Sequence, residues 1–248
     1  MKRLLNILVV FIIFIGCKQT SKADTVAEVE NVSQTPFQTF INSLPSTELP
    51  LNHSSYEYLF TKEQSDWDNN LFLFKINLSK LNKELIIYES KSYDFESLQN
   101  SKKYSVGDFL KKYPGRNMED YALEKYRDEA VNANDNVFFN IPILKFSIND
   151  TYIIGFLTVV ASENDNAFAA IRLQTYTKQG KLMISNDRKL KNGLTLIYGF
   201  SSEDGAVNIF STISKNGSVE RKRIFVSEEK LERITKYQVS AKGFIPLD

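Results

Sequence analysis

The sequence predicts an α+β protein that is mainly β, with one large antiparallel meander sheet and a few short helices in the N-terminal half. In the C-terminal half, runs of apolar, β-branched and aromatic residues alternate with turn dipeptides such as Asn149-Asp150 and Asn216-Gly217. Helical spacing of apolar residues occurs only in the N-terminal half. The sequence leaves open whether the sheet is curled towards a barrel, folded into a sandwich or open.

The first folded element is predicted to be a two-turn helix that ends at Pro45. Its apolar residues at helical spacing are Phe37, Phe40, Ile41 and Leu44. Residues 46–70 show no clear period, and the apolar runs 71–76 and 85–88 then predict two buried strands. These strands would bring the chain into the core before the next helices.

Two further helices are predicted between the early strands and the meander. Residues 105–113 form a helical pattern that ends at Pro114-Gly115. Asn117 is suited to cap a second helix, and Glu119 and Asp120 are favourably placed in its first turn, where the helix dipole stabilises negative charge.

In the meander, the run Tyr152 to Ala161 is apolar on both faces, so we expect a central strand covered on each side. The strand around Ile224 carries alternating charges and is predicted to lie near an edge. We expect the basic cluster Arg221-Lys222-Arg223 to alternate between faces without forming one patch, and to protect an edge strand from pairing with other chains. Asn216-Gly217 is expected to be a two-residue type I′ turn.

The first seventeen residues contain an export signal. Lys2 and Arg3 precede an apolar run from Leu4 to Ile15, which is short for a retained membrane helix because spanning a bilayer takes about 20 residues. The run closes with Phe14-Ile15-Gly16-Cys17, which resembles the lipobox of bacterial lipoproteins, with Phe14 in place of the usual leucine.

The resemblance implies that residues 1–16 are a cleaved signal peptide and that the thiol of Cys17 receives a diacylglyceryl group. The protein would then be attached to a membrane through a lipid anchor on Cys17. The next residue is Lys18 and not the aspartate that retains some lipoproteins in the inner membrane, so the implied location is the outer membrane of the cell envelope. Cys17 is the only cysteine, and the chain therefore forms no internal disulfide.

The domain organisation follows from composition. Residues 17–35 are predicted to be the lipidated cysteine and a flexible tether, because 18–35 contains no aromatic residue and no large aliphatic beyond three valines. Residues 36–248 are predicted to be a single strand-rich globular domain. Without the signal peptide the chain has 232 residues (248 less 16), which is long enough to bury a large core.

Net charge argues against nucleic acid as a partner. Removing Lys2 and Arg3 leaves 29 basic residues (31 less two) against 30 acidic residues, so the mature chain is nearly neutral. Nucleic-acid binding usually relies on an excess of basic charge. We therefore expect no nucleic-acid partner.

The sequence assigns no catalytic, metal-binding or cofactor-binding residue. His53 is the only histidine and lies in a predicted loop, and Cys17 is taken by the lipid, which excludes the usual His and Cys–His zinc sites. The stretch Gly199-Phe200-Ser201-Ser202-Glu203 lacks the second glycine of a serine-hydrolase nucleophile elbow. No glycine pattern for nucleotide phosphates is present, and we expect no cofactor.

Paired carboxylates are the remaining catalytic option, since glycoside hydrolysis uses two acids about 5 to 9 Å apart and needs no histidine. Asp66-Trp67-Asp68 would suit a sugar ring stacked on the only tryptophan. Residues 132–136 have alternating oxygen donors but lack the glycine and glutamate of a calcium loop. Residues 162–166 are interpreted as a polar hairpin loop.

Two functional hypotheses follow. The leading hypothesis is a lipid-anchored, non-catalytic binding or structural protein of the cell envelope whose partner is an envelope protein or a glycan. The alternative is a glycan-acting hydrolase that uses paired carboxylates. An exposed aromatic patch, with Tyr56, Tyr58 and Tyr93 as candidates, would favour the first hypothesis. Two acids converging in one cleft would favour the second.

Overall fold

The computed structural model describes most of the chain after the predicted tether. The described residues are 34–66, 71–129, 136–162, 166–185, 187, 190, 193–202, 205–226 and 230–247. The predicted signal peptide and the predicted lipidation site, Cys17, lie outside these ranges. Among the described residues, no helix has both the length and the apolar character needed to cross a bilayer.

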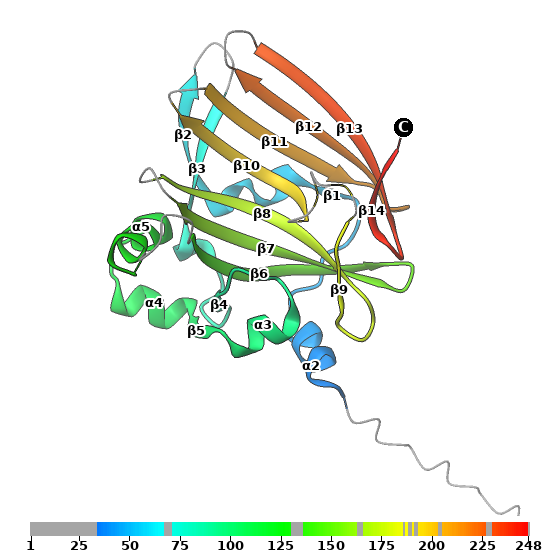
Figure 1. The fold of residues 1–248 in the computed structure, drawn as a ribbon, viewed down its shortest axis with the longest axis horizontal. Helices are drawn as coiled ribbons and strands as arrows, with labels where there is room; N and C mark the ends of the chain where they lie inside the picture. Colours follow the sequence, from blue (N-terminus) through cyan, green and yellow to red (C-terminus); the bar gives the residue numbers. More distant parts are fainter. Residues whose placement is uncertain are drawn as a thin grey trace, which may run out of the picture. The chain divides into compact units, whose positions relative to one another are not determined.

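One antiparallel sheet of 12 strands dominates the described residues, which confirms the predicted fold class (Figure 1). Its strands are β1 Leu51–Asn52, β4 Ile86–Glu89, β5 Lys102–Ser105, β6 Val137–Ile148, β7 Thr151–Ser162, β8 Asn166–Tyr176, β9 Leu182–Met183, β10 Leu194–Ser202, β11 Gly205–Ile213, β12 Ser218–Val226, β13 Lys230–Ser240 and β14 Gly243–Leu247. Their order is β14-β13-β12-β11-β10-β8-β7-β6-β4-β5, with β1 beside β11 and β9 beside β8. The strands from β6 onward form the predicted meander, and the sheet is not closed into a barrel.

The two faces of the sheet are covered by different elements. Side chains alternate between faces along a strand, and paired residues on neighbouring strands share a face. We call the face that carries Ile154 and Phe156 of β7 the α2 face, because α2 (Pro36–Ser43) and α3 (Phe95–Asn100) supply side chains to its core. The opposite face carries Leu157 and Val159, and we call it the hairpin face.

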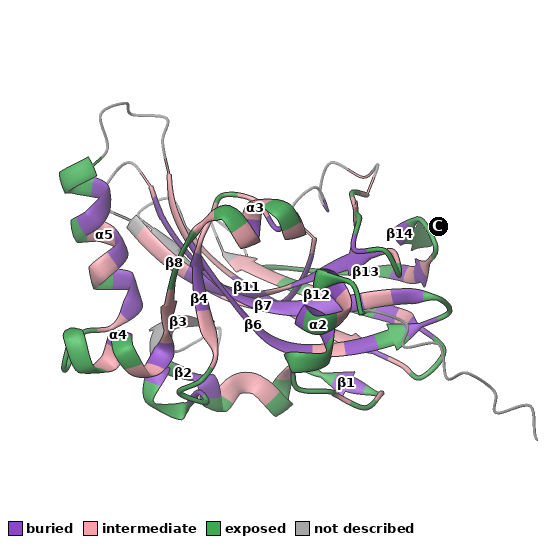
Figure 2. Ribbon diagram, turned by 90° about the horizontal axis from the view of Figure 1, so that it is seen from below, coloured by how far each residue is buried: buried purple, intermediate pink, exposed green. Residues whose placement is uncertain are grey.

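The hairpin face is covered by a second, two-stranded sheet and by helices. The covering elements are η1 (His53–Leu59), β2 (Phe60–Asp66), β3 (Leu71–Ile76), η2 (Leu78–Lys80), α4 (Val106–Lys112) and α5 (Met118–Glu129). Buried and exposed residues alternate along α5, as expected of a helix that packs one side on a core (Figure 2). The strand β7 is buried along nearly its whole length, which confirms that it is central.

The predicted helices are confirmed together with their caps. In α2, the Thr35 hydroxyl accepts the backbone N–H of Gln38 at 3.2 Å, so the helix is capped one residue before its first turn. The side chain of Asn117 accepts the N–H of Asp120 at 2.7 Å, as predicted for the N-cap of α5. The predicted strands 71–76 and 85–88 correspond to β3 and, displaced by one residue, to β4.

The structure confirms that the strand around Ile224 lies near an edge, and corrects the role predicted for its charges. The strand β12 lies near the edge, but it pairs with β11 on one side and β13 on the other and is therefore not an edge strand itself. The edge is formed by β14 and by the first half of β13, which extends beyond the end of β14. Charges on β12 therefore do not serve to block an exposed strand edge.

The turn between β11 and β12 also differs from the prediction. Ser214 donates its N–H to the carbonyl of Ser218 at 2.8 Å, and Gly217 donates to Ser214 at 3.0 Å, so three residues lie between the closing pair. Gly217 has a φ of 81°, whereas Asn216 is not in the positive-φ region. The loop is thus a type I turn followed by a left-handed glycine, and not a type I′ turn. The side chain of Asn216 accepts the N–H of Ser218 at 3.0 Å, which favours this geometry.

We expect Gly217→Val to lower the free energy of unfolding by about 1–2 kcal/mol or more, because a Cβ is strained at this φ. An added Cβ would also lie 3.1 Å from Gln238 Nε2 and 3.2 Å from the side chain of Ile148. Urea denaturation measures the change. The matched control is Lys215→Val, an exposed position in the same loop, and equal stability of the two variants would contradict the turn assignment.

Candidate functional site

His53 begins the short helix η1 and does not lie in an open loop. Its ring packs against Phe210 with 4.7 Å between centroids, and its Nε2 lies 3.6 Å from Glu57 Oε1. Burial lowers the pKa of His53, and the Glu57 carboxylate opposes this by raising it. Among the described residues no group of three or more His, Cys, Asp or Glu side chains could hold a metal ion. These contacts suit a packing role for the imidazole.

The three tyrosines proposed for an aromatic surface differ in their environments. Tyr58 is 59% exposed, and Tyr56 is half-buried. Tyr93 is buried: its hydroxyl lies 3.0 Å from Thr158 Oγ1, and its ring packs on Phe156. The prediction for Tyr93 is wrong, because the irregular segment that carries it folds over the α2 face.

The acidic motifs identified in the sequence lie largely outside the part of the chain that the structure describes. Trp67, Asp68 and residues 132–135 lie outside the described ranges, and Asp66 is described only as the end of β2. Ser162 and Asn166 form the last pair of β7 and β8, which confirms the hairpin predicted at 162–166. The described residues therefore do not test Asp66-Trp67-Asp68 or residues 132–136 as a site.

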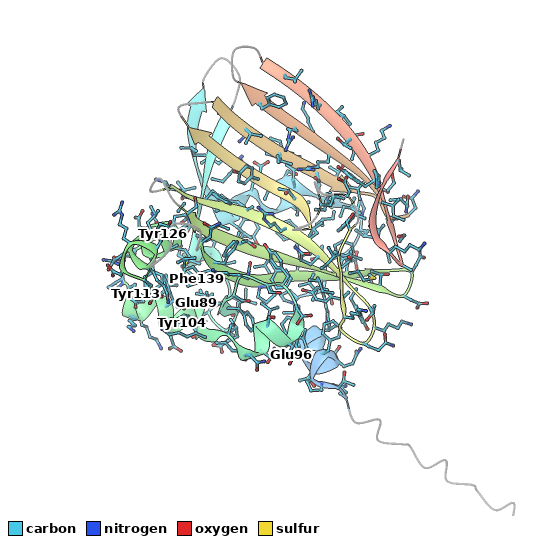
Figure 3. The ribbon with its side chains drawn as sticks, in the orientation of Figure 1. Glu89, Glu96, Tyr104, Tyr113, Tyr126 and Phe139 are labelled. Carbon is cyan, nitrogen blue, oxygen red and sulfur yellow. The ribbon has the colours of Figure 1, made fainter. Side chains whose placement is uncertain are left out.

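Two other carboxylates do meet in a pocket of about 240 Å³ between the ends of β4 and α5. Lys125, which is 8% exposed, places its Nζ 2.5 Å from Glu89 Oε1 and 3.4 Å from Glu129 Oε2. The hydroxyl of Tyr104 donates to Glu89 Oε2 at 3.2 Å, and both residues are labelled in Figure 3. Because both oxygens of Glu89 are engaged by donors within the protein, neither is free to protonate a glycosidic oxygen. We interpret the cluster as an ion pair that joins α5 to the sheet.

A group of arginines on the α2 face is the most distinctive cluster of charge. Its members, which we call the arginine surface, are Arg172 on β8, Arg221 and Arg223 on β12, and Arg233 on β13. Arg233 pairs directly with Arg223 across the two strands. Lys222 points to the hairpin face, where its Nζ lies 2.5 Å from Glu232.

The register of the sheet places these arginines on one face. Arg223 pairs with Ile209 of β11, Ile209 with Tyr198 of β10, and Tyr198 with Ala170 of β8, two residues from Arg172. The α2 and α3 helices lie at the β4–β6 end of the sheet, away from β12 and β13 (Figure 1). Arg223 and Arg233 are accordingly exposed.

Among the described strand residues, the arginine surface has no acid on its own face: β8 and β10 to β13 place no Asp or Glu there. Burial lowers the pKa of Arg223, and the like charges of Arg221 and Arg233 lower it further. Directly opposed like charges destabilise a sheet, each pair by roughly 0.2–1 kcal/mol. The fold therefore retains an arrangement that its own stability disfavours.

Part of this positive charge lies in a small recess. Arg221 is only 8% exposed, and its Nε is buried without a hydrogen-bond partner, as is the Nε of Arg172. A recess of about 40 Å³ lies beside Arg221, which is large enough for one oxygen atom of a ligand. Its lining residues are Arg221, Arg223, Arg233, Thr235 and Tyr237. An anionic oxygen placed here would lie beside Arg221, whose buried, unpaired Nε costs about 1–3 kcal/mol.

Half-buried aromatic rings lie between and beside the arginines. Burial raises the pKa of Tyr198 to about 12, whereas the positive charges of Arg172 and Arg223 lower it. Arginines from both ends of the arginine surface therefore act electrostatically on the Tyr198 hydroxyl. Phe168 packs edge-on against Tyr198 with 5.7 Å between centroids. The guanidinium of Arg233 lies 5.6 Å from the centroid of Phe225.

Sequence reasoning missed this surface because it treated Arg221-Lys222-Arg223 as a single run. The alternation between faces is correct for Lys222, but it leaves Arg221 and Arg223 on the same side. The neighbours Arg172 and Arg233 come from other strands, and only the register brings them together. The spacing of Arg221 and Arg223 in a predicted strand was the one local signal available.

No protein-family model, curated protein or solved structure matches this chain. The function must therefore be inferred from the chemistry of its own surface.

Proposed function

We propose that this protein is a lipid-anchored, non-catalytic binding protein of the bacterial outer membrane that holds an anionic ligand on the arginine surface. The observation that carries the proposal is the set of four arginines on one sheet face, where the described strand residues include no acid, in a chain that is nearly neutral. A nearly neutral protein has enough acids to pair such a cluster. We infer that the lack of acids among the described strand residues of this face leaves the arginines available for an external anion.

The buried donors strengthen this proposal. Surface arginines that serve only solubility are normally solvated, whereas Arg221 is nine-tenths buried with an unpaired Nε. Features that lower stability, such as a buried donor without a hydrogen-bond partner, occur most often at functional sites. Guanidinium groups also bind carboxylates and phosphates in a fixed planar geometry, which makes arginine suited to this task.

The binding surface can be tested by retention on a sulfated-polysaccharide column at neutral pH. We expect the double variant Arg223→Gln/Arg233→Gln to elute at lower salt than the wild-type domain, because both changed residues are exposed on the arginine surface. The control is Lys222→Gln/Lys236→Gln, which removes the same charge from the hairpin face. If both double variants lose retention equally, binding follows net charge and the proposed surface is wrong.

The anchor is tested separately. We expect Cys17→Ser to prevent lipid attachment and to release the protein from the membrane fraction, because the thiol is the acceptor in lipoprotein processing. Fractionation and metabolic labelling with a fatty acid would measure both effects. An acylated Cys17→Ser protein that still sediments with membranes would contradict the lipobox assignment.

A further inference from the structure

We propose that the ligand is a linear acidic glycan that lies across the strands from β13 to β8, with its anionic groups seated along the arginine surface. This inference rests on the proposed function and adds the class and orientation of the ligand. Three features of the surface support it: its length, the position of its buried donors and its aromatic rings.

The length of the arginine surface exceeds that of a compact anion. Three strand spacings separate Arg223 on β12 from Arg172 on β8, which corresponds to about 14 Å across the sheet. Arg172 is also displaced by two residues along the strand, about 7 Å, so the two positions lie about 16 Å apart. A compact anion beside the backbone of one of these positions lies far from the backbone of the other. A chain with repeated anionic groups can lie beside both.

The unpaired buried donors lie at both ends of this path. Arg221 has its free Nε beside the recess on β12, and Arg172 has another on β8. A ligand with one anionic group at each end would satisfy both donors at once. Charge-assisted hydrogen bonds of this kind are about twice as strong as neutral ones.

The aromatic rings favour a sugar chain over an inorganic polyanion. Tyr198 lies on β10, between the two ends, and Phe225 lies on β12 beside Arg223; both are half-buried. Flat aromatic surfaces pack against the apolar faces of sugar rings, and tyrosine adds a hydroxyl at the wet edge. Phosphate chains have no such apolar face.

The test is calorimetric titration of the full mature protein in detergent, because a domain that begins at residue 34 would lack the lipid anchor. The probes are galacturonic acid as the monomer, trimer and hexamer, and polyphosphate with the charge of the hexamer. We expect affinity to rise with glycan length. Loss of one charged hydrogen bond in Arg172→Gln should weaken hexamer binding about tenfold or more and weaken monomer binding much less, because the monomer can still bind beside Arg221.

Two controls make the result specific. Lys222→Gln should bind every probe as the wild type does, because its side chain lies on the hairpin face. Tyr198→Leu should weaken hexamer binding much more than polyphosphate binding, because only the glycan would pack on the ring. Thermal melting of each variant checks that the fold is retained.

The outcomes separate the two proposals. If the monomer binds but the hexamer gains nothing, or if Arg172→Gln affects both alike, the extended mode is wrong and the anion-binding function stands. If polyphosphate matches the hexamer and Tyr198→Leu weakens neither, the glycan class is wrong. If no probe binds to the wild-type protein, the proposed function itself fails.

Discussion

Ile154→Ala should lower the free energy of unfolding by roughly 2–5 kcal/mol. Ile154 is fully buried in the central strand β7, in the cluster that also contains Phe156 and Tyr176. The alanine variant loses the branched end of the side chain and leaves a cavity beneath α2. Hydrogen bonds to β6 and β8 hold β7 on both sides, so the strand cannot move to close this cavity.

Urea denaturation of three variants would measure this effect. Ile154→Val removes a smaller part of the same side chain and should cost about 0.5–1.5 kcal/mol. Leu231→Ala, on the same face of β13 but 37% exposed, should change stability by about 0.5 kcal/mol or less. If Ile154→Ala costs no more than Leu231→Ala, then α2 does not pack on β7 as the structure shows.

The elements that were predicted correctly are those determined by residues close to one another in the sequence. The apolar spacing of α2, the N-cap at Asn117 and the continuous apolar run of β7 each depend on residues within a few positions of one another. Side-chain hydrogen bonds and burial patterns at this range are nearly independent of the rest of the fold. The class of the fold follows from the succession of such patterns.

The errors concern properties set by pairing between distant strands. The charges of β12 were wrongly predicted to protect an edge strand, and the placement of Arg172 and Arg223 on one face was missed, because both depend on strand order and register. The turn at Asn216 was misjudged because Asn-Gly also fits a type I turn followed by a left-handed glycine. The extra loop residue, Lys215, decides between the two geometries.

The burial of Glu119 could have been predicted from a local signal. Its place in the first turn of α5 was predicted to be favourable because of the helix dipole, which does not determine whether the side chain is buried. However, Glu119, Ala122 and Tyr126 recur at the spacing of one helix face, and this face is buried. Glu119 is only 4% exposed; its Oε1 accepts the N–H of Ile76 at 2.7 Å, and its Oε2 is buried without a partner.

This environment makes the stability of the protein depend on pH. Burial raises the pKa of Glu119 from 4.5 to about 7, and Asp120 adds to the shift, whereas the N–H of Ile76 and the charge of Lys75 oppose it. Between these two values the folded protein holds a proton that the unfolded chain has released. The contribution of Glu119 to the free energy of unfolding is therefore largest below pH 4.5 and decreases as the pH rises to about 7. Above about pH 7 it is constant. The total change is about 3 kcal/mol.

Glu119→Gln should remove this dependence, because the amide oxygen can still accept the N–H of Ile76 and no charge has to be buried. We expect the variant to be more stable than the wild type at pH 8, by up to about 3 kcal/mol, and to show a flatter profile between pH 4.5 and 7. Urea denaturation at a series of pH values measures both. Asp120→Asn, the exposed neighbour in the same turn, should keep the wild-type slope in this range. If the stability of Glu119→Gln changed with pH in parallel with that of the wild type, the Glu119 carboxyl would be hydrated in solution. Water would then reach the contact between α5 and β3.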